Sequence, residues 1–251
     1  MTSKHEFALF VDQLSENVAK IQINQEFKLA NQDLAHRISN VLRLKAGEQV
    51  ALFDRASNCL IQLNALNKKE IQGLLLTKQY NKKLTPSITF ALPLLKRDDF
   101  EVALYSLVEL GANKVQIITT QKTQRAWGQE KEFERCQRVL ISAAEQSKNF
   151  AMPELCPPIT LTSFLSQIAS NMYSKVYFDV DGQPCMNVIE SIVAQKSQEL
   201  ILMAGPEGDL TADEKQIVQN AGFQFCALTP TILRAASAVQ LGLGIFRTVV
   251  K

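Results

Sequence analysis

From Ser87 to the end of the 251-residue chain, short apolar runs alternate with longer segments of helical periodicity. Strands are predicted at 87–95, 114–120, 175–180, 199–204 and 223–228, and helices at 98–111, 130–147, 162–170 and 187–195 and from Thr211 and Thr231. Strands that alternate with helices form a parallel sheet covered on both faces. The sequence therefore predicts an α/β fold whose ligands bind at the carboxyl ends of the strands.

The first eighty residues have a different pattern, with short alternating apolar runs at 7–11, 19–23, 48–54, 59–66 and 71–76. One helical stretch lies among them at 29–44, with Asn31 as a plausible cap and with Leu34, Ile38, Val41 and Leu42 spaced for one face. This pattern predicts a small β-barrel with one helix. The polar segment 81–87 is interpreted as a linker, so domains are expected at 1–80 and 84–251.

The composition is that of an ordinary globular protein, with 46% hydrophobic and 21% charged residues and a net charge of +2. Residues 1–83 hold 12 Lys and Arg against 8 Asp and Glu, whereas residues 84–251 hold 15 against 17. The first part is therefore expected to face phosphates, although a solvated surface gives the same excess. The apolar runs are too short for a membrane span, and we expect a cytoplasmic protein without membrane contact.

Several kinds of site are excluded by the absence of their motifs. The five cysteines form no CxxC pair, and only two histidines are present, so no metal is expected. GxGxxG and GxxxxGK motifs are absent, as is a GxSxG elbow. An ordinary dinucleotide enzyme or serine hydrolase is therefore not expected.

Two glycine- or proline-containing turns follow neighbouring strand patterns. The apolar run 199–204 leads into Gly205-Pro-Glu-Gly208, and Thr211 with Glu214 forms a capping box, so free helix amides are expected to face a ligand. A tight turn without a ligand is the alternative.

The strand at 223–228 leads into a second turn, with Arg234 expected in the first helical turn. Because the helix dipole disfavours a cation there, Arg234 should have an outside partner, either a phosphate, Glu207 or solvent.

Four segments together resemble the RsmE family of small-subunit rRNA uracil-N3 methyltransferases, which belong to the SPOUT superfamily. They are HRISNVLRLKAGEQVALFD (36–54), AAEQS (143–147), GPEGDLTADE (205–214) and TPTILRAASA (229–238). The segments occur in the family's order, and the resemblance covers nearly the whole chain. It implies an N-terminal PUA-like barrel that holds RNA, a C-terminal domain with a deep trefoil knot, and a homodimer.

The resemblance also implies the reaction, which is methyl transfer from S-adenosylmethionine to N3 of a uridine in 16S rRNA of the small ribosomal subunit. The implied cofactor-binding residues lie in the two turns and are Met203, Ala204, Gly205, Pro206, Glu207, Gly208, Leu228, Thr229, Ile232, Leu233 and Ala238. Arg234 is the implied catalytic residue, acting by charge because arginine is no base at neutral pH.

Further roles follow from the other two segments. Glu145 and Gln146 match the family's AEQ and are implied to orient the base or line the dimer seam; a polar helix terminus is the alternative. His36, Arg43 and Lys45 are implied to contact RNA. Alternatively, Arg43 braces the barrel against Asp54 or Glu48.

The sequence departs from the family pattern at several positions. Asp209 replaces the last glycine of GPEGG, and Leu233-Arg-Ala-Ala-Ser-Ala238 stands where the family has LRTETA. The basic residue that the family has near the N-terminus is not obvious in KHEFALF (4–10), and the helix at 98–111 lacks the lysine that is common there. These losses motivate a second hypothesis, an RNA-binding assembly protein that keeps the donor pocket but has lost the chemistry. Methylation of another RNA nucleotide is a third.

Overall fold

The computed structural model describes residues 7–67, 69–169 and 173–250, and the chain forms two compact units. Unit 1 contains residues 1–82 together with 144–151. Unit 2 contains residues 83–143 and 152–251. The segment 144–151 thus packs with unit 1, although it lies far along the chain.

Unit 1 is built on a five-stranded sheet in the order β1-β3-β4-β5-β2. Its strands are β1 (Phe7–Phe10), β2 (Glu26–Ala30), β3 (Gln49–Phe53), β4 (Ser57–Leu66) and β5 (Glu70–Tyr80), and its helices are α1 (Leu14–Val18) and α2 (Gln32–His36). β1 runs parallel to β3, and the other pairs are antiparallel. Within the described residues no pairing joins β1 to β2, so the paired strands form an open sheet.

One strand predicted for unit 1 is wrong. The run 19–23 is a loop after α1 rather than a strand, and Lys78 Nζ donates to the carbonyls of Val18, Ala19 and Ile21 at 3.0, 3.2 and 3.2 Å. Because a side chain satisfies these acceptors, the segment needs no partner strand. The second strand lies instead at Glu26–Ala30, where alternate residues are buried.

The predicted helix at 29–44 is shorter than expected. Asn31 is confirmed as its cap, because its side chain accepts from Leu34 N at 2.9 Å. After α2 the chain widens into a π-helical turn, η1 (Arg37–Val41), in which Leu42 N donates to Arg37 O at 2.9 Å. The wider turn changes the side-chain register. Ile38 is therefore buried as expected, but Val41 is 63% exposed.

Unit 2 is an α/β unit with a six-stranded, all-parallel sheet in the order β11-β9-β10-β6-β7-β8, which confirms the predicted fold class. The strands are β6 (Ser87–Pro93), β7 (Lys114–Thr119), β8 (Glu154–Thr160), β9 (Ser174–Pro184), β10 (Glu199–Ala204) and β11 (Gln224–Ala227). The helices are α3 (Arg97–Glu109), α4 (Gln129–Ser147), α5 (Leu161–Gln167), α6 (Cys185–Gln195), α7 (Ala212–Asn220) and α8 (Ala235–Val249).

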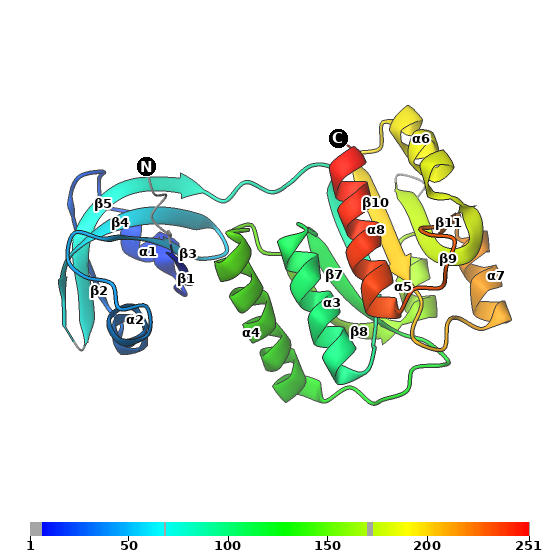
Figure 1. Cartoon of the computed structure of the whole chain (residues 1–251), viewed down its shortest axis with the longest axis horizontal. Helices are drawn as coiled ribbons and strands as arrows, with labels where there is room; N and C mark the ends of the chain where they lie inside the picture. The colour runs from blue at the N-terminus through cyan, green and yellow to red at the C-terminus, as the bar shows by residue number, and fades with distance from the viewer. Residues whose placement is uncertain (1–6, 68, 170–172, 251) are drawn as a thin grey trace. The chain divides into compact units, whose positions relative to one another are not determined.

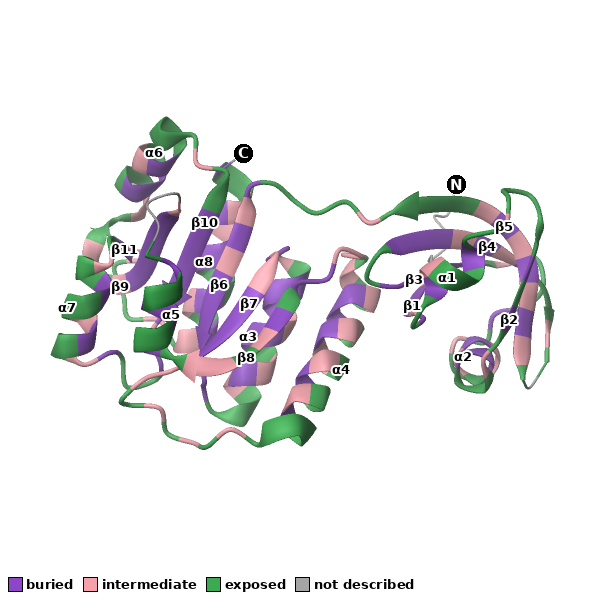
Figure 2. Ribbon diagram, turned by 180° about the vertical axis from the view of Figure 1, so that it is seen from behind, coloured by how far each residue is buried: buried purple, intermediate pink, exposed green. Residues whose placement is uncertain are grey.

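Helices cover both faces of this sheet, as the strand–helix alternation predicts. α3 and α8 lie on one face, and α5 and α7 lie on the other (Figures 1 and 2). The central strand β10 is buried along all but its first residue. The apolar composition of ELILMA therefore follows from its central place in a parallel sheet.

Two elements of unit 2 differ from the prediction. β8 has the sequence ELCPPIT, and its prolines obscure the strand pattern. It pairs only with β7 at the edge of the sheet, where a missing amide breaks no ladder. α8 begins at Ala235 rather than Thr231, because Arg234 is its extended N-cap and Thr229 Oγ1 donates to Thr231 O in a local turn at 2.7 Å.

α8 is fixed to the sheet at two places. Gly242 packs against the Phe178 ring, where a Cβ atom would overlap the ring carbons. Near the other end, Arg247 donates to Pro86 O at 2.7 Å, Gly111 O at 2.6 Å and Asn113 Oδ1 at 2.8 Å. These contacts set where the N-terminal end of α8, with Arg234, lies against the sheet.

Among the described residues, no helix is both long enough and apolar enough to cross a membrane. No group of three or more His, Cys, Asp or Glu side chains in the same residues is placed to hold a metal ion.

Candidate functional site

A cavity of about 560 Å³ opens in unit 2 at the carboxyl ends of β6, β9, β10 and β11. Its volume is within the range of small-molecule sites. The residues that line it come from β9 and β11, from the segments after β6, β10 and β11, and from the first turns of α3 and α8: Lys96, Asp99, Phe178, Asp179, Val180, Gly205, Pro206, Glu207, Asp209, Cys226, Leu228, Thr229, Thr231, Ile232, Leu233, Arg234, Ala235 and Ala238.

Most of the residues expected to bind a cofactor line this cavity. They are Gly205, Pro206, Glu207, Leu228, Thr229, Ile232, Leu233 and Ala238, and Arg234 lines it as well. Met203 and Ala204 do not, because they lie within β10 and are at most 1% exposed. Gly208 also lies outside the lining. The two turns that are implied to hold the cofactor therefore border the same cavity.

Sequence reasoning missed the lining residues that lie after β6 and within β9. Lys96 comes directly after the β6 segment, and Phe178, Asp179 and Val180 belong to β9. β6 and β9 are the two hydrogen-bonded neighbours of β10. Strand order, which a single sequence does not reveal, was the missing signal.

The first wall is the turn from Gly205 to Leu210, which follows β10. Asp209 N donates to Pro206 O at 2.9 Å, and Glu207 Oε1 accepts from Lys96 N at 2.7 Å. A Cβ atom at position 205 would lie 2.8 Å from both Tyr177 Oη and Asp209 Oδ1. Only glycine therefore fits at the start of this turn.

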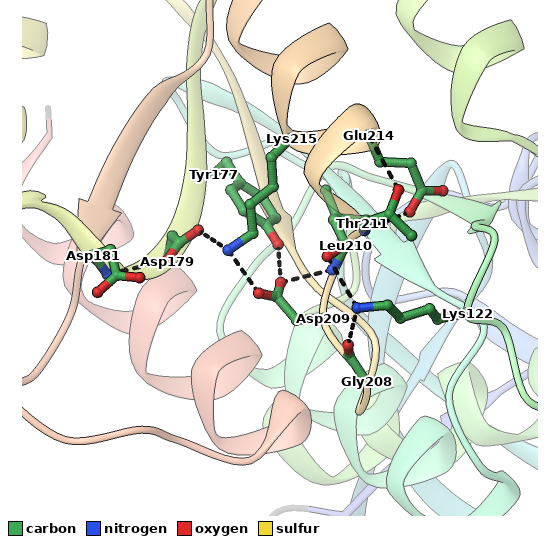
Figure 3. A network of polar contacts seen from close by, with 10 residues as sticks. All are labelled: Lys122, Tyr177, Asp179, Asp181, Gly208, Asp209, Leu210, Thr211, Glu214 and Lys215. Atoms are coloured by element: carbon green, nitrogen blue, oxygen red, sulfur yellow. Dashed lines mark hydrogen bonds and ion pairs between the residues drawn. The ribbon is translucent and has the colours of Figure 1, made fainter.

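Asp209 is the centre of a polar network behind the turn (Figure 3). Its Oδ1 accepts from Tyr177 Oη at 2.6 Å and from Leu210 N at 2.7 Å, and its Oδ2 lies 2.7 Å from Lys215 Nζ. Asp209 has a φ of 56°, a left-handed conformation that favours glycine. Aspartate tolerates this conformation when its carboxylate bonds nearby groups, so the network compensates for the missing glycine.

Lys215 bridges two carboxylates, because its Nζ also lies 2.6 Å from Asp179 Oδ2. Burial alone would raise the pKa of Asp209, but hydrogen bonds from Lys215, Tyr177 and Leu210 N outweigh it and lower that pKa. Burial lowers the pKa of Lys215, and the two carboxylates raise it more. Asp209 and Lys215 are therefore both charged at neutral pH.

The lowered pKa of Asp209 predicts a pH-dependent contribution to stability. A depressed carboxyl pKa stabilises the folded state above the ordinary value of 3.8, and this contribution is lost as the pH falls through the folded-state pKa. Asp209→Asn should therefore lower the free energy of unfolding at pH 7 and lower it less at pH 3. Urea unfolding of both proteins across this range measures the difference; a constant difference would contradict the charged network.

A second lysine holds the outer side of the turn. Lys122, in the loop after β7, donates through Nζ to Gly208 O at 2.8 Å and to Leu210 O at 3.2 Å. Glu214, only 4% exposed, accepts from Gln121 N of the same loop at 2.7 Å. The loop and the turn are thereby tied together.

Replacing Lys122 with methionine should loosen the turn without removing a residue from the cavity. The variant loses two charge-assisted hydrogen bonds but keeps the aliphatic stem. We expect hydrogen exchange of the amides at 205–210 to accelerate, and the free energy of unfolding to fall by about 1 kcal/mol or less, because Lys122 is exposed. Lys122→Arg is the matched control, and unchanged exchange in Lys122→Met would show that the contact does not hold the turn.

The capping box of α7 is confirmed, but its expected role is wrong. Thr211 Oγ1 accepts from Glu214 N at 3.2 Å, and Glu214 Oε2 accepts from Thr211 N at 2.9 Å. None of residues 210–220 lines the cavity. The capping box therefore closes the start of α7 on itself, and no residue of this helix borders the cavity.

The second wall is the irregular segment 228–234, which ends at Arg234. Arg234 is exposed, and within the described part of the chain its guanidinium has no hydrogen-bond or ion-pair partner. Glu207 was one candidate, but its carboxylate accepts from Lys96 N instead. Arg234 therefore offers a free cation at the cavity, which leaves a ligand or solvent as its partner.

Glu145 and Gln146 do not line the cavity. Glu145 belongs to unit 1, where it accepts from Arg37 Nη1 at 3.0 Å and Nη2 at 2.7 Å and from Phe10 N at 3.0 Å. The bidentate pair with Arg37 fixes the last turn of α4 to η1, and the bond from Phe10 N fixes it to β1, all within unit 1. Gln146 is exposed. Their implied roles in the reaction stay predictions.

His36, Arg43 and Lys45 are all exposed in unit 1. Arg43 has a φ of 56°, and among the described residues no carboxylate reaches its guanidinium. The carboxylate of Asp54 accepts from the amides of Ser15, Ala56 and Ser57 at 2.6 to 2.8 Å. The alternative that Arg43 braces the sheet against Asp54 or Glu48 is therefore wrong, and RNA contact stays a prediction.

Comparison with known proteins places the chain among RNA-modifying enzymes. The family model described as the RNA methyltransferase domain matches residues 82–247. A relative from Synechocystis sp., named ribosomal RNA small subunit methyltransferase E, is 30% identical over 216 residues, which cover 83% of this chain and 68% of the relative. A relative of the same name from Rickettsia conorii is 25% identical over 225 residues, covering 88% of each chain.

A crystal structure of ribosomal RNA small subunit methyltransferase E from Neisseria gonorrhoeae, bound to S-adenosyl methionine, shares the fold. It superposes with a TM-score of 0.81 over 97% of this chain and 98% of that chain, at 23% sequence identity. Because a family model and a relative of 30% identity both match most of its length, the chain belongs to the ribosomal RNA small subunit methyltransferase E family.

Proposed function

We propose that this protein is an S-adenosylmethionine-dependent methyltransferase that modifies N3 of a uridine in the 16S rRNA of the small ribosomal subunit. The observation that carries the proposal is the cavity between the two turns, with Arg234 in its lining and its guanidinium free of any partner among the described residues. The name shared by the relatives supports small-subunit rRNA as the substrate.

The residues of the cavity fit the donor. Leu228, Leu233 and Ala238 supply apolar surface for an adenine ring, and the irregular backbone of 228–233 supplies amides and carbonyls. Residues 205–207 of the first turn supply a second stretch of backbone. When bound, S-adenosylmethionine supplies an electrophilic methyl group on a sulfonium.

Arg234 supplies charge at the site of reaction. Uracil N3 carries a weakly acidic proton, which must leave for the nitrogen to attack the methyl carbon. A guanidinium stabilises the negative charge that develops on the ring, and because it stays protonated it does not take the proton. The two walls hold nucleophile and methyl group in line, which lowers the entropic part of the barrier.

We further propose the finer features implied by the family. These are a PUA-like barrel at 1–80 that holds RNA with His36, Arg43 and Lys45, and a knotted SPOUT domain at 84–251. The protein acts as a homodimer in the cytoplasm, with Glu145 and Gln146 at the base or the dimer seam. The partner-free guanidinium of Arg43, within the described residues, supports an RNA contact in unit 1.

Reverse-transcription mapping of 16S rRNA from cells with and without the gene tests the target. Methylation at N3 blocks base pairing, so one strong stop at a uridine should be present only when the gene is. A stop pattern that does not depend on the gene would exclude this target, and a gene-dependent mark on another nucleotide would indicate the same fold with different specificity.

A second candidate function is supported by the start of α8. Ala235, Ala236 and Ser237 follow Arg234, so no carboxylate stands next to it where the family pattern has glutamate. A protein that binds donor and RNA in ribosome assembly without turnover fits this loss. Calorimetry that detects both ligands, combined with no methyl transfer to any RNA, would favour it.

A further inference from the structure

The charged residues that line the cavity are unequally divided. Four are acidic, Asp99, Asp179, Glu207 and Asp209, and two are basic, Lys96 and Arg234. Lys215 does not line the cavity but lies behind it, against Asp179 and Asp209. These two carboxylates form one wall of the cavity, with Lys215 behind it.

Asp179 and Asp209 share a single cation. Lys215 Nζ lies 2.6 Å from Asp179 and 2.7 Å from Asp209, and the other donors to these carboxylates are the neutral Tyr177 hydroxyl and two backbone amides. The Asp179 side chain is only 4% exposed, so water screens its charge poorly. One negative charge of this wall is left uncompensated.

We propose that the Asp179–Lys215–Asp209 wall makes the cavity select a cationic methyl donor over the neutral product that methyl transfer leaves. This inference rests on the proposed function. S-adenosylmethionine carries a sulfonium, an ammonium and a carboxylate, for a net charge of +1. Transfer breaks the sulfur–methyl bond and forms the nitrogen–methyl bond, the bonding pair returns to sulfur as a neutral thioether, and the N3 proton goes to solvent.

The uncompensated charge has a direct consequence for turnover. S-adenosylhomocysteine has nearly the same shape as the donor but a net charge of zero, so apolar and backbone contacts distinguish the two poorly. A negative wall attracts the donor, which has a net positive charge, but it does not attract the product, which has no net charge. The product is therefore released after each transfer, because the reaction itself removes the positive charge that the wall holds.

Removing a negative charge and removing a positive charge from this network should shift the ratio of donor affinity to product affinity in opposite directions. At an effective dielectric constant of about 20, one charge some 8 Å from a monocation changes its affinity roughly thirtyfold, and salt and open solvent reduce this to about threefold to tenfold. Asp209→Asn should lower the ratio of donor affinity to product affinity by that factor. Lys215→Met should raise the ratio by a similar factor, because it removes the cation that pairs with Asp179 and Asp209.

Calorimetry with S-adenosylmethionine and S-adenosylhomocysteine, at pH 8 and low salt, measures both affinities for the intact protein and each variant. Asp213→Asn is the matched control, because Asp213 is an exposed carboxylate of α7 outside the cavity lining, and it should leave the ratio unchanged. A merely structural network would weaken both ligands in both variants and leave the ratio constant. That result would overturn the inference.

Salt dependence of the unaltered protein gives an independent reading if a variant fails to fold. Raising the salt from about 0.05 to 0.5 M should weaken donor binding severalfold and leave product binding nearly unchanged. Equal salt dependence of the two ligands would contradict the inference. If neither ligand binds the unaltered protein, the proposed function itself fails; if both bind with a ratio that neither salt nor charge shifts, only the wall's selectivity fails.

Discussion

Replacing Arg234 with alanine should abolish methyl transfer and leave donor affinity within about threefold. Arg234 is the N-cap residue of α8, it is exposed, and in the described part of the chain it has no protein partner. Its removal should therefore not unfold the protein. Loss of one preorganised charge at developing negative charge costs about a hundredfold to a thousandfold in rate.

Single-turnover transfer of a labelled methyl group measures the rate, and calorimetry measures donor affinity. Arg234→Lys keeps a charge without the planar fork and should recover part of the activity. Arg138→Ala removes an exposed arginine outside the cavity lining and should transfer at the unaltered rate. Full activity in Arg234→Ala would show that the guanidinium takes no part in the reaction.

Replacing Gly205 with alanine should damage both the fold and the cavity. The new Cβ atom would lie 2.8 Å from Tyr177 Oη and from Asp209 Oδ1, so the turn must move or the hydrogen bond between them must break. Overpacking of this kind costs about 1 to 3 kcal/mol of stability. We expect a matching fall in the free energy of unfolding and a loss of donor affinity of at least tenfold.

Gly208→Ala is the matched control within the same turn. A Cβ atom there would meet only the flexible Lys122 side chain, with its Cδ at 3.3 Å, so stability and donor affinity should change little. Urea unfolding and calorimetry on both variants make the comparison. Equal behaviour of the two variants would contradict the close packing of Tyr177 and Asp209 behind Gly205.

The local pattern of the chain predicts most of unit 2 because its elements are regular. Periodicity finds every strand of the sheet except β8, whose Pro157 and Pro158 are tolerated only because it lies at the edge. Predictions for unit 1 fail where side chains from distant segments complete the structure. The carbonyls at 18–21 are satisfied by Lys78, and no local pattern at 19–23 reveals that.

In the candidate site, too, the local sequence pattern predicts some features, and others depend on residues from distant segments. Glycine and proline mark both turns in the sequence, so Gly205 to Glu207 and Leu228 to Leu233 are predictable as walls. Lys122 and Lys215 reach the first turn from other elements, and the bond between Asp209 and Tyr177 depends on strand order. The departure from the family glycine at Asp209 is visible in the sequence, but its compensation by three hydrogen-bonding neighbours is visible only in the fold.

The most direct test of the proposed function is methyl transfer by the purified protein. Labelled S-adenosylmethionine is incubated with small ribosomal subunits that lack the modification, and the labelled rRNA is digested and mapped. Label in one uridine of 16S rRNA, as a base methylated at N3 and absent with Arg234→Ala, is the predicted result. Donor binding without label in any RNA would contradict the account and leave a donor-binding assembly protein in its place.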